Sequence, residues 1–394
     1  MNSHPCSRRR FLRLGLTAAA AAPFAPQLLR DSLASAVSRE SLAKAKVAVV
    51  RCRGYGGEVK NAYKEAFDLL GGISGLVKDK TVTVKLNLTG TNFADYMNRS
   101  VGETYMTHYD TAAALTAALF LAGARRVRFV ESTQSRSSLD ATLSLADWDV
   151  KALKAMGNVE FENTRNLGSG KSYSHFKVPN GGLMFSELDL NHSYADTDVM
   201  VSLCKMKQHV TAGITLSMKN LFGLTPNSLY GDKAGSEDAT AGRGPIHSPF
   251  GFEKTSVKLP GLRQGALSPE PTWRVPRTIV DIISVRPIHL AIIDGITAMS
   301  GGEGPWCAGA NKQFLTTPGV LVVGFNPVST DAVGTSLMGY DNPRAARGNK
   351  PFHFCDNHIR LAEQAGLGTA DLSQIEVLGT SIKDARYPYK DLAA

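Results

Sequence analysis

Residues Leu203–Gly223, LCKMKQHVTAGITLSMKNLFG, decide the fold that this sequence predicts, because they join a buried strand to a helix. The run before them, residues 197–203, is apolar and begins between two aspartates, which is typical of a strand covered on both faces. From Thr211 onward, the apolar residues recur at helical spacing. The stretch therefore predicts a strand-to-helix junction.

This junction concentrates groups that bind anions. Lys205, Lys207 and His209 are spaced by two and so share one face of the strand, whereas Thr215 and Lys219 are spaced by four and share one face of the helix. The free backbone N–H groups of a helix N-terminus add to the attraction. In open α/β sheets, ligands bind at the carboxyl ends of the strands. We therefore predict a site for a small anionic molecule here; the alternative is that the lysines are solvated and the histidine is structural.

Strands and helices alternate along the rest of the chain. Compact apolar or alternating runs predict strands at residues 46–52, 81–87, 126–131, 289–294 and 319–325, and segments of helical periodicity lie between them. This alternation predicts an α/β fold with a mainly parallel sheet and helices on both faces.

One long segment interrupts the alternation. Residues 225–272 are rich in Gly, Pro and Ser and have few apolar runs. A loop of this length is uncommon in a compact domain unless it has a function. We therefore predict a lid-like insertion over the site within a single large α/β domain of residues 37–394; disorder of the segment is the alternative.

Residues 1–36 resemble a twin-arginine export signal. Paired arginines in Ser7–Arg13, SRRRFLR, precede an Ala-rich apolar run at Leu14–Ala22, which is too short and too weakly apolar for a stable membrane span. We predict recognition by the twin-arginine export machinery and a periplasmic or otherwise exported location. A basic disordered tail is the alternative, and no other stretch is a candidate membrane span.

Net charge and cysteine spacing argue against two classes of function. Of the net charge of +9, segment 1–36 contributes five arginines and one aspartate, and 9 − 5 + 1 leaves about +5. The remaining chain has no Lys/Arg stripe with interleaved aromatic residues, which argues against nucleic-acid binding. The cysteines after the signal are far apart in sequence, so we expect no iron–sulfur cluster, whereas disulfides remain open.

Other candidate site residues follow other predicted strands. Lys85 and Asn87 end the second strand, Asp294 ends a later one, and Glu303 is the single carboxylate of the glycine-rich loop that comes next. His108 precedes a predicted helix and is a candidate metal ligand together with His209.

Several short motifs lie at these predicted strand ends. They are Val84–Asn87 (VKLN), Lys205–His209 (KMKQH), Gly213–Gly223 (GITLSMKNLFG), Asp294–Gly295 with Gly301–Pro305 (GGEGP), and Asp331–Val333 with Met338–Gly339. Together they resemble the family of the domain of unknown function DUF362, over most of the chain after the signal. The resemblance implies an α/β fold without a settled activity. It also marks as site positions Lys85, Asn87, Lys205, Lys207, His209, Lys219, Asn220, Asp294, Gly304 and Asp331.

Some members of that family carry a ferredoxin-like module and are described as iron–sulfur proteins. This sequence lacks the cysteine run of such a module, so that property does not carry over.

The leading functional hypothesis is an exported enzyme that acts on a small anion, with or without a bound metal. The catalytic candidates are Lys207, His209, Asp294 and Glu303. The substrate-binding candidates are Lys85, Asn87, Lys205, Thr215, Lys219 and Asn220. The reaction remains open between isomerisation, redox chemistry and hydrolysis. The alternatives are a non-catalytic periplasmic protein that binds an anion or a metal, and a redox protein that carries a cofactor.

Overall fold

The computed structural model describes residues 44–89, 95–133, 137–240, 242–247, 258–266, 268, 270, 272–307 and 313–390. Residues from Ala45 onward form one compact unit. The predicted export signal, residues 1–36, lies outside the described residues, as does the part of the predicted lid at residues 248–257. In the described part of the chain, no helix is both long and apolar enough to cross a membrane.

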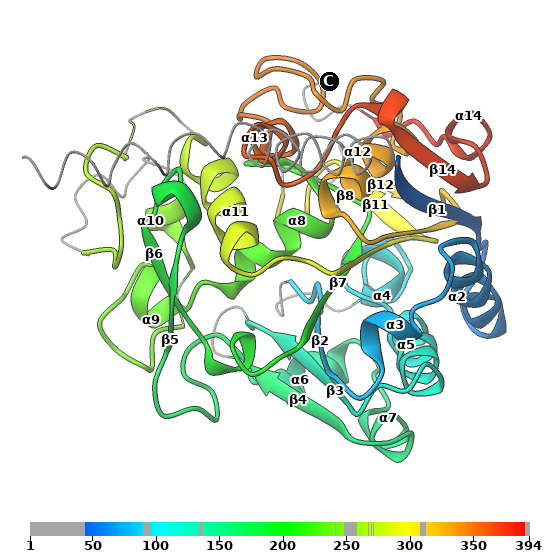
Figure 1. Cartoon of the computed structure of the whole chain (residues 1–394), viewed down its shortest axis with the longest axis horizontal. Coiled ribbons are helices and arrows are strands. Elements are labelled where there is room, and N and C mark those ends of the chain that lie inside the picture. Colours follow the sequence, from blue (N-terminus) through cyan, green and yellow to red (C-terminus); the bar gives the residue numbers. More distant parts are fainter. Residues whose placement is uncertain are drawn as a thin grey trace, which may run out of the picture. The chain divides into compact units, whose positions relative to one another are not determined.

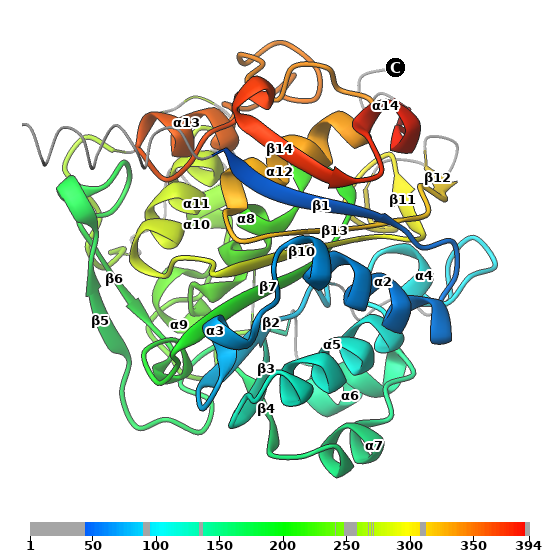
Figure 2. The same cartoon turned by 45° about the vertical axis from the view of Figure 1, so that its right-hand side comes forward.

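An eight-stranded sheet with the strand order β14-β1-β13-β10-β7-β2-β3-β4 organises this unit (Figures 1 and 2). The strands are β14 (Ile375–Gly379), β1 (Ala45–Arg51), β13 (Val320–Gly324), β10 (Leu290–Gly295), β7 (Val199–Lys205), β2 (Thr81–Lys85), β3 (Arg126–Glu131) and β4 (Val159–Asn163). Strand β13 runs antiparallel to both of its neighbours, and the other neighbouring strands are parallel. The predicted α/β fold with a mainly parallel sheet is confirmed.

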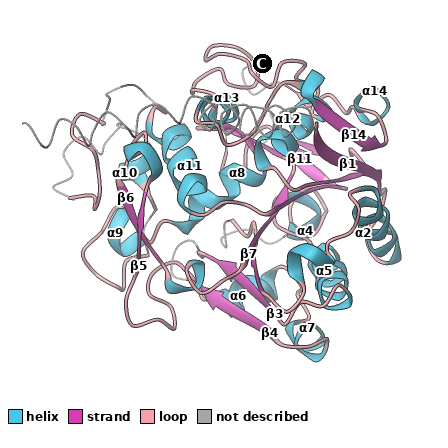
Figure 3. Ribbon diagram, viewed as in Figure 1, coloured by secondary structure: helices cyan, strands magenta, loops and turns pink. Residues whose placement is uncertain are grey.

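Helices cover both faces of the sheet, as Figure 3 shows. The residues of β7 alternate between two apolar layers: Met200 and Cys204 belong to one, and Val201 and Leu203 to the other. The first layer includes α8 (Ser217–Asn220), α11 (Arg274–Val285), α12 (Pro327–Leu337), α13 (His358–Gln364) and α14 (Ile382–Ala385). The second includes α2 (Gly57–Leu69), α3 (Ser74–Val77), α4 (Val101–Thr104), α5 (Tyr109–Leu121), α6 (Leu139–Leu145) and α7 (Val150–Ala155). Because both faces are covered, the central strands are buried along their whole length.

Short hairpins, helices and 3-10 turns lie outside the main sheet. Three hairpins pair β5 (Ser174–Lys177) with β6 (Glu187–Leu190), β8 (Lys207–His209) with β9 (Gly213–Thr215), and β11 (Ala298–Ser300) with β12 (Phe314–Thr316). The described part of the predicted lid contains α9 (Asn227–Tyr230) and α10 (Gly244–His247). The 3-10 turns are η1 (Pro179–Gly181), η2 (His192–Tyr194), η3 (Leu221–Leu224) and η5 (Leu372–Gln374).

The helix predicted from Thr211 onward is wrong. The chain first forms the β8–β9 hairpin, and only Ser217–Asn220 is helical as α8. Gly213 has a φ of 77°, and a Cβ at this position would lie 2.6 Å from the ring of Phe352. In the hairpin, Thr215 pairs with Lys207. Thr215 therefore reaches Lys207 by strand pairing rather than along a helix face.

Candidate functional site

A cavity of about 210 Å³ lies at the carboxyl ends of β2 and β3. Its walls come from these strand ends, the β8–β9 hairpin, α8 with the turn after it, the segment at α10 and the loop after β11. The lining residues are Lys85, Asn87, Thr89, Glu131, Ser132, Lys207, His209, Thr215, Lys219, Asn220, Phe222, Gly223, Arg243, His247, Glu303 and Trp306.

The cavity brings together most of the site residues predicted from the sequence. They are Lys85, Asn87, Lys207, His209, Thr215, Lys219, Asn220 and Glu303. Lys205, Asp294 and His108 are not among its lining residues. The lining residues that sequence reasoning did not name as site candidates include Arg243, His247 and Trp306.

Lys85 and Glu131 form a buried ion pair in the wall. The Lys85 Nζ lies 2.5 Å from the Glu131 Oε1, and the two side chains are only 2% and 3% exposed. Glu131 also accepts hydrogen bonds from the backbone N–H groups of Leu88 and Ser132. Burial lowers the pKa of Lys85, and the Glu131 carboxylate opposes that effect. The pair joins the ends of β2 and β3 and fixes this part of the wall.

Lys207 joins the hairpin to the loop after β11. Its Nζ donates to the carbonyl oxygens of Tyr105 at 2.6 Å and Glu303 at 2.9 Å, and to the Thr89 Oγ1 at 3.4 Å. Burial lowers the pKa of Lys207 to about 7, against the opposing effect of the Glu303 carboxylate. Because an ammonium has three hydrogens, these three acceptors use all of them. Lys207 therefore contributes positive charge to the cavity, but no lone pair while these bonds exist.

Lys219 on α8 differs from Lys207 in its contacts. Its Nζ lies 4.7 Å from the centre of the Phe222 ring and makes no hydrogen bond with the described residues. Burial lowers the pKa of Lys219 to about 8, and the Glu303 carboxylate again opposes the shift. Lys219 is thus a cavity-lining amine whose hydrogens are available to a ligand.

Asp331 of α12 holds α8 in place. Its Oδ1 accepts from the backbone N–H of Ser217 at 2.9 Å and from the Ser217 Oγ at 2.6 Å, and its Oδ2 accepts from the Met218 N–H at 2.9 Å. These bonds satisfy N–H groups of the first helical turn, which have no partner within the helix. A buried carboxylate outside the cavity therefore positions Lys219 and Asn220.

His209 is held as a neutral ring. Its Nδ1 accepts from the backbone N–H of Thr211 at 3.1 Å, so the neutral tautomer carries its hydrogen on Nε2. Burial, reinforced by the charge of Lys219, lowers the pKa of His209 well below its usual range. The Nε2 lies 3.9 Å from the Glu303 Oε1, and the other oxygen of Glu303 accepts from the Val210 N–H at 3.1 Å. His209 thus offers an N–H donor beside a carboxylate.

The predicted lid, residues 225–272, contributes two lining residues that the sequence did not identify. His247 donates from Nδ1 to the Arg243 carbonyl oxygen at 2.7 Å, which leaves its Nε2 as an acceptor, and burial lowers its pKa to about 4. The Arg243 Nε donates to the Thr225 carbonyl oxygen at 2.7 Å, and its Nη2 donates to Gly223 and Ser132. The sequence feature that could have marked them is an arginine and a histidine close together in a Gly- and Pro-rich segment.

Cations exceed carboxylates around the cavity. The positively charged lining residues are Lys85, Lys207, Lys219 and Arg243, and the carboxylates are Glu131 and Glu303. One cation is neutralised by the Lys85–Glu131 pair. The rest leave an excess of positive charge in a largely enclosed space, which favours an anion.

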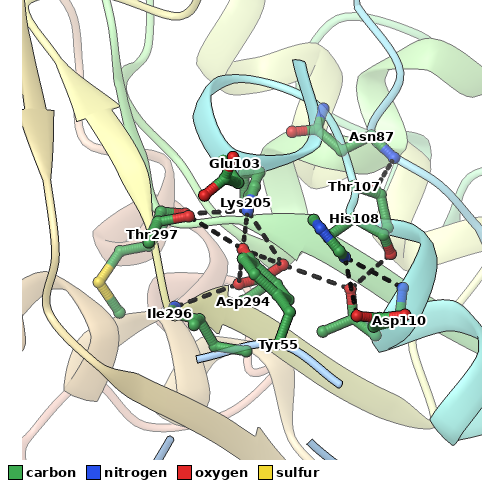
Figure 4. A network of polar contacts seen from close by, with 12 residues as sticks. Tyr55, Asn87, Glu103, Thr107, His108, Asp110, Lys205, Asp294, Ile296 and Thr297 are labelled. Carbon is green, nitrogen blue, oxygen red and sulfur yellow. Dashed lines mark hydrogen bonds and ion pairs between the residues drawn. The ribbon is translucent and has the colours of Figure 1, made fainter. Parts of the chain in front are cut away.

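Lys205 and Asp294 form a separate polar cluster, shown in Figure 4. The Lys205 Nζ lies 3.1 Å from the Asp294 Oδ2, and both side chains are fully buried. The same Nζ donates to the Tyr55 hydroxyl at 2.6 Å and to the Thr297 carbonyl oxygen at 2.9 Å. Asp294 also accepts from the Thr111 hydroxyl at 3.3 Å. These contacts join β7, β10 and α5, so we interpret the pair as structural.

Lys207 lines the cavity and Lys205 does not, because they belong to different strands. Strand β7 ends at Lys205, and the chain then starts the hairpin at Lys207. The predicted continuous strand, with both lysines and His209 on one face, is therefore wrong. The two ammonium groups have entirely different hydrogen-bond partners.

His108 belongs to the same cluster as Lys205. Its ring stacks on Tyr55 with the centroids 3.5 Å apart, and its Nδ1 accepts from the Asp110 N–H at 3.0 Å as the N-cap of α5. Within the described ranges, no group of three or more His, Cys, Asp or Glu side chains is arranged to hold a metal ion. A metal site of His108 with His209 stays a prediction.

Comparison with known proteins identifies the family. The family model described as "Domain of unknown function (DUF362)" matches residues 82–336. The chain belongs to the DUF362 family. The matched segment of this DUF362 protein runs from β2 to α12 and contains all the lining residues of the cavity. No curated protein matches the chain.

Solved structures show distant similarity to this DUF362 protein. One is a structural-genomics crystal structure of a protein from Thermotoga maritima, with 12% sequence identity and a TM-score of 0.34 over 62% of this chain and 50% of that one. Another is the lactate racemase apoprotein from Thermoanaerobacterium thermosaccharolyticum, with 10% identity and a TM-score of 0.36 over 71% and 55% of the two chains. The chain thus spans about half the length of these structures.

Proposed function

We propose that this protein is an exported enzyme that binds a small organic anion in the cavity and transfers a proton to or from it. The carrying observation is Lys219, an amine with a pKa lowered to about 8 and no hydrogen-bond partner among the described residues, in the wall of a cationic cavity. A general acid–base group works best with a pKa near the working pH. An amine in this range can both lose and regain a proton near neutrality.

The other lining residues have roles that suit this chemistry. Arg243 supplies positive charge for the anionic group, and Lys207 adds to it while protonated; their own hydrogen bonds hold both side chains in place. The His209 Nε2–H can donate to charge that develops on the ligand, and the His247 Nε2 can accept a hydrogen. Glu303 lies beside Lys207 and His209, which supports the enzyme over a non-catalytic binding protein.

Hydrogen exchange tests this function directly. The protein is incubated in D₂O with a panel of small carboxylates that are unsubstituted, 2-hydroxy- or 2-amino-substituted, and loss of the C2 proton signal is followed by NMR. We expect exchange in at least one member of the panel. If carboxylates bind saturably but none exchanges, the protein is a non-catalytic anion-binding protein.

A bound metal ion or another cofactor stays a prediction from the sequence. Elemental analysis and visible absorption of freshly purified protein test it, and a stoichiometric metal or a chromophore would support it. We expect no iron–sulfur absorption, from the cysteine spacing.

Anion affinity should fall as the pH rises. Burial lowers the pKa of Lys207 to about 7 and that of Lys219 to about 8, so both amines lose positive charge across and above this range. An anion binds the protonated amines more tightly and raises their pKa, so binding takes up protons there. Calorimetric titration with propionate should show full affinity below about pH 6 and, above pH 8, a loss of up to about tenfold per pH unit for each of the two amines. An affinity that stays constant to pH 10 would contradict the assignment of these cations to the site.

Export should depend on the paired arginines near the N-terminus. Replacing Arg8 and Arg9 with lysine keeps the charge but removes the guanidinium groups of the twin-arginine motif. We expect nearly all of the protein to stay in the cytoplasm on cell fractionation, with the exchange of Lys44 for arginine as a control. An unchanged periplasmic yield would show that segment 1–36 is not a twin-arginine signal.

A further inference from the structure

We propose that the anion bound in this cavity carries hydroxyl groups next to its charged group, so that the ligand is a small hydroxylated carboxylate or phosphate. This inference rests on the proposed function and specifies its substrate class. It comes from unpaired side-chain oxygens of buried residues that line the cavity, because an anion without donors cannot satisfy the amide oxygens among them.

Asn220 provides the clearest of these acceptors. Its Nδ2 donates to the Lys85 carbonyl oxygen and to the Ser202 Oγ, both at 3.1 Å. Because a carbonyl oxygen can only accept, this contact fixes which end of the amide is nitrogen. The Oδ1 has no hydrogen-bond partner among the described residues, and Asn220 is only 4% exposed. Its acceptor is thus oriented by the fold and left unused.

Asn87 and Thr215 add two more unpaired atoms to the same wall. The Asn87 Oδ1 and the Thr215 Oγ1 have no partner in the described part of the chain, and the residues are 4% and 3% exposed. Both residues line the cavity with Asn220. An unpaired buried polar group is costly, so three of them around one cavity point to a ligand that pairs with them.

The chemistry of the unpaired atoms restricts the ligand. Amide oxygens accept hydrogens, and a carboxylate or a fully ionised phosphate has none to offer. The cations of Lys219 and Arg243 already provide donors for the anionic group. A ligand that matches both sets therefore has an anionic end and neighbouring O–H donors. Ammonium groups are less suitable as the donor, because the cavity already has an excess of positive charge.

The size of the cavity agrees with such a ligand. At roughly 30 Å³ per water molecule, its volume of about 210 Å³ corresponds to about seven waters. A three-carbon hydroxy acid or its phosphate counterpart is of this size. Glycerate and glycerol 3-phosphate are therefore suitable probes, with propionate and propyl phosphate as partners that lack the hydroxyl groups.

The test uses the whole mature protein and calorimetric titration with these four probes. We expect at least about tenfold tighter binding of the hydroxylated member of one pair, and whether that is the carboxylate or the phosphate pair identifies the anionic group. Asn87→Ala should reduce this preference about three- to tenfold. Thr215→Val should weaken the binding of all four probes, because the Thr215 hydroxyl can also donate to the anionic group. Asn61→Ala, an exposed position on α2, is the matched control and should change neither value.

Thermal melting separates a binding role from a structural one. Thr215→Val and Asn87→Ala remove side-chain atoms that have no partner, so the Tm should stay the same or rise. A lower Tm together with weaker binding of all probes would show that these residues are structural and would overturn the inference. Equal affinities within both pairs would also overturn it, while the anion site would stand. Binding of none of the four probes would overturn both this inference and the proposed function.

Discussion

Replacing Lys219 with methionine should slow proton exchange of the substrate by a factor of about a hundred to ten thousand, which is the usual contribution of a positioned acid–base group. The Tm should stay the same or rise, because the Lys219 Nζ has no hydrogen bond in the described structure and burial already disfavours its charge. NMR measurement of exchange in D₂O and thermal melting of the same samples check both expectations.

Two lysine variants provide the comparison. Lys207→Met should reduce binding but also lower the Tm, because it removes hydrogen bonds to the Tyr105 and Glu303 carbonyl oxygens. Lys60→Met, at an exposed position of α2, should change neither quantity. If Lys219→Met exchanges at the wild-type rate with a native Tm, Lys219 is not the acid–base group.

Replacing Asp294 with alanine should reduce the free energy of unfolding by about 3–5 kcal/mol, the usual cost of removing one partner of a buried ion pair. The variant leaves the fully buried ammonium of Lys205 without its carboxylate. Chemical denaturation checks the magnitude. We therefore expect the effect of Asp294 on activity to follow its effect on stability.

An exposed ion pair serves as the control. Lys64 and Asp68 lie 2.6 Å apart on the surface of α2, and Asp68→Ala should leave the denaturation midpoint unchanged. If Asp294→Ala keeps native stability but loses activity, Asp294 has the catalytic role that the sequence suggested.

The strands were the most predictable part of this fold. Their apolar runs are long and uninterrupted because both faces of the sheet are covered, and Arg126–Glu131 was predicted with the bounds that the structure shows. The β8–β9 hairpin was not predicted. Its residues have apolar positions at helical spacing, but Gly213 takes a positive φ against Phe352, a residue far away in sequence. Tertiary packing here overrides the local pattern.

The site residues were also predictable only where a local sequence pattern marks them. Lys85 and Lys207 could be found because cations at predicted strand ends stand out against apolar strands, and Glu303 because it is the single carboxylate of the glycine-rich loop. The sequence did not predict that Lys205 and Lys207 lie in different polar clusters, because this depends on β7 ending at Lys205.

Arg243 and His247 were missed for another reason. They lie in a segment without periodicity, where no pattern assigns a direction to a side chain. Their place in the cavity depends on contacts of Arg243 with Gly223 and Thr225, which the sequence alone does not reveal.

The position of β1 determines when this protein can fold. The first strand of the sheet lies between β13 and β14, which are built from residues 320–324 and 375–379. During synthesis, β1 therefore has neither of its partners until almost the whole described chain has left the ribosome. Strands this far apart in sequence pair slowly. Until they pair, an exposed strand can associate with other chains. The nascent protein should accordingly depend on chaperones until its last strand is made.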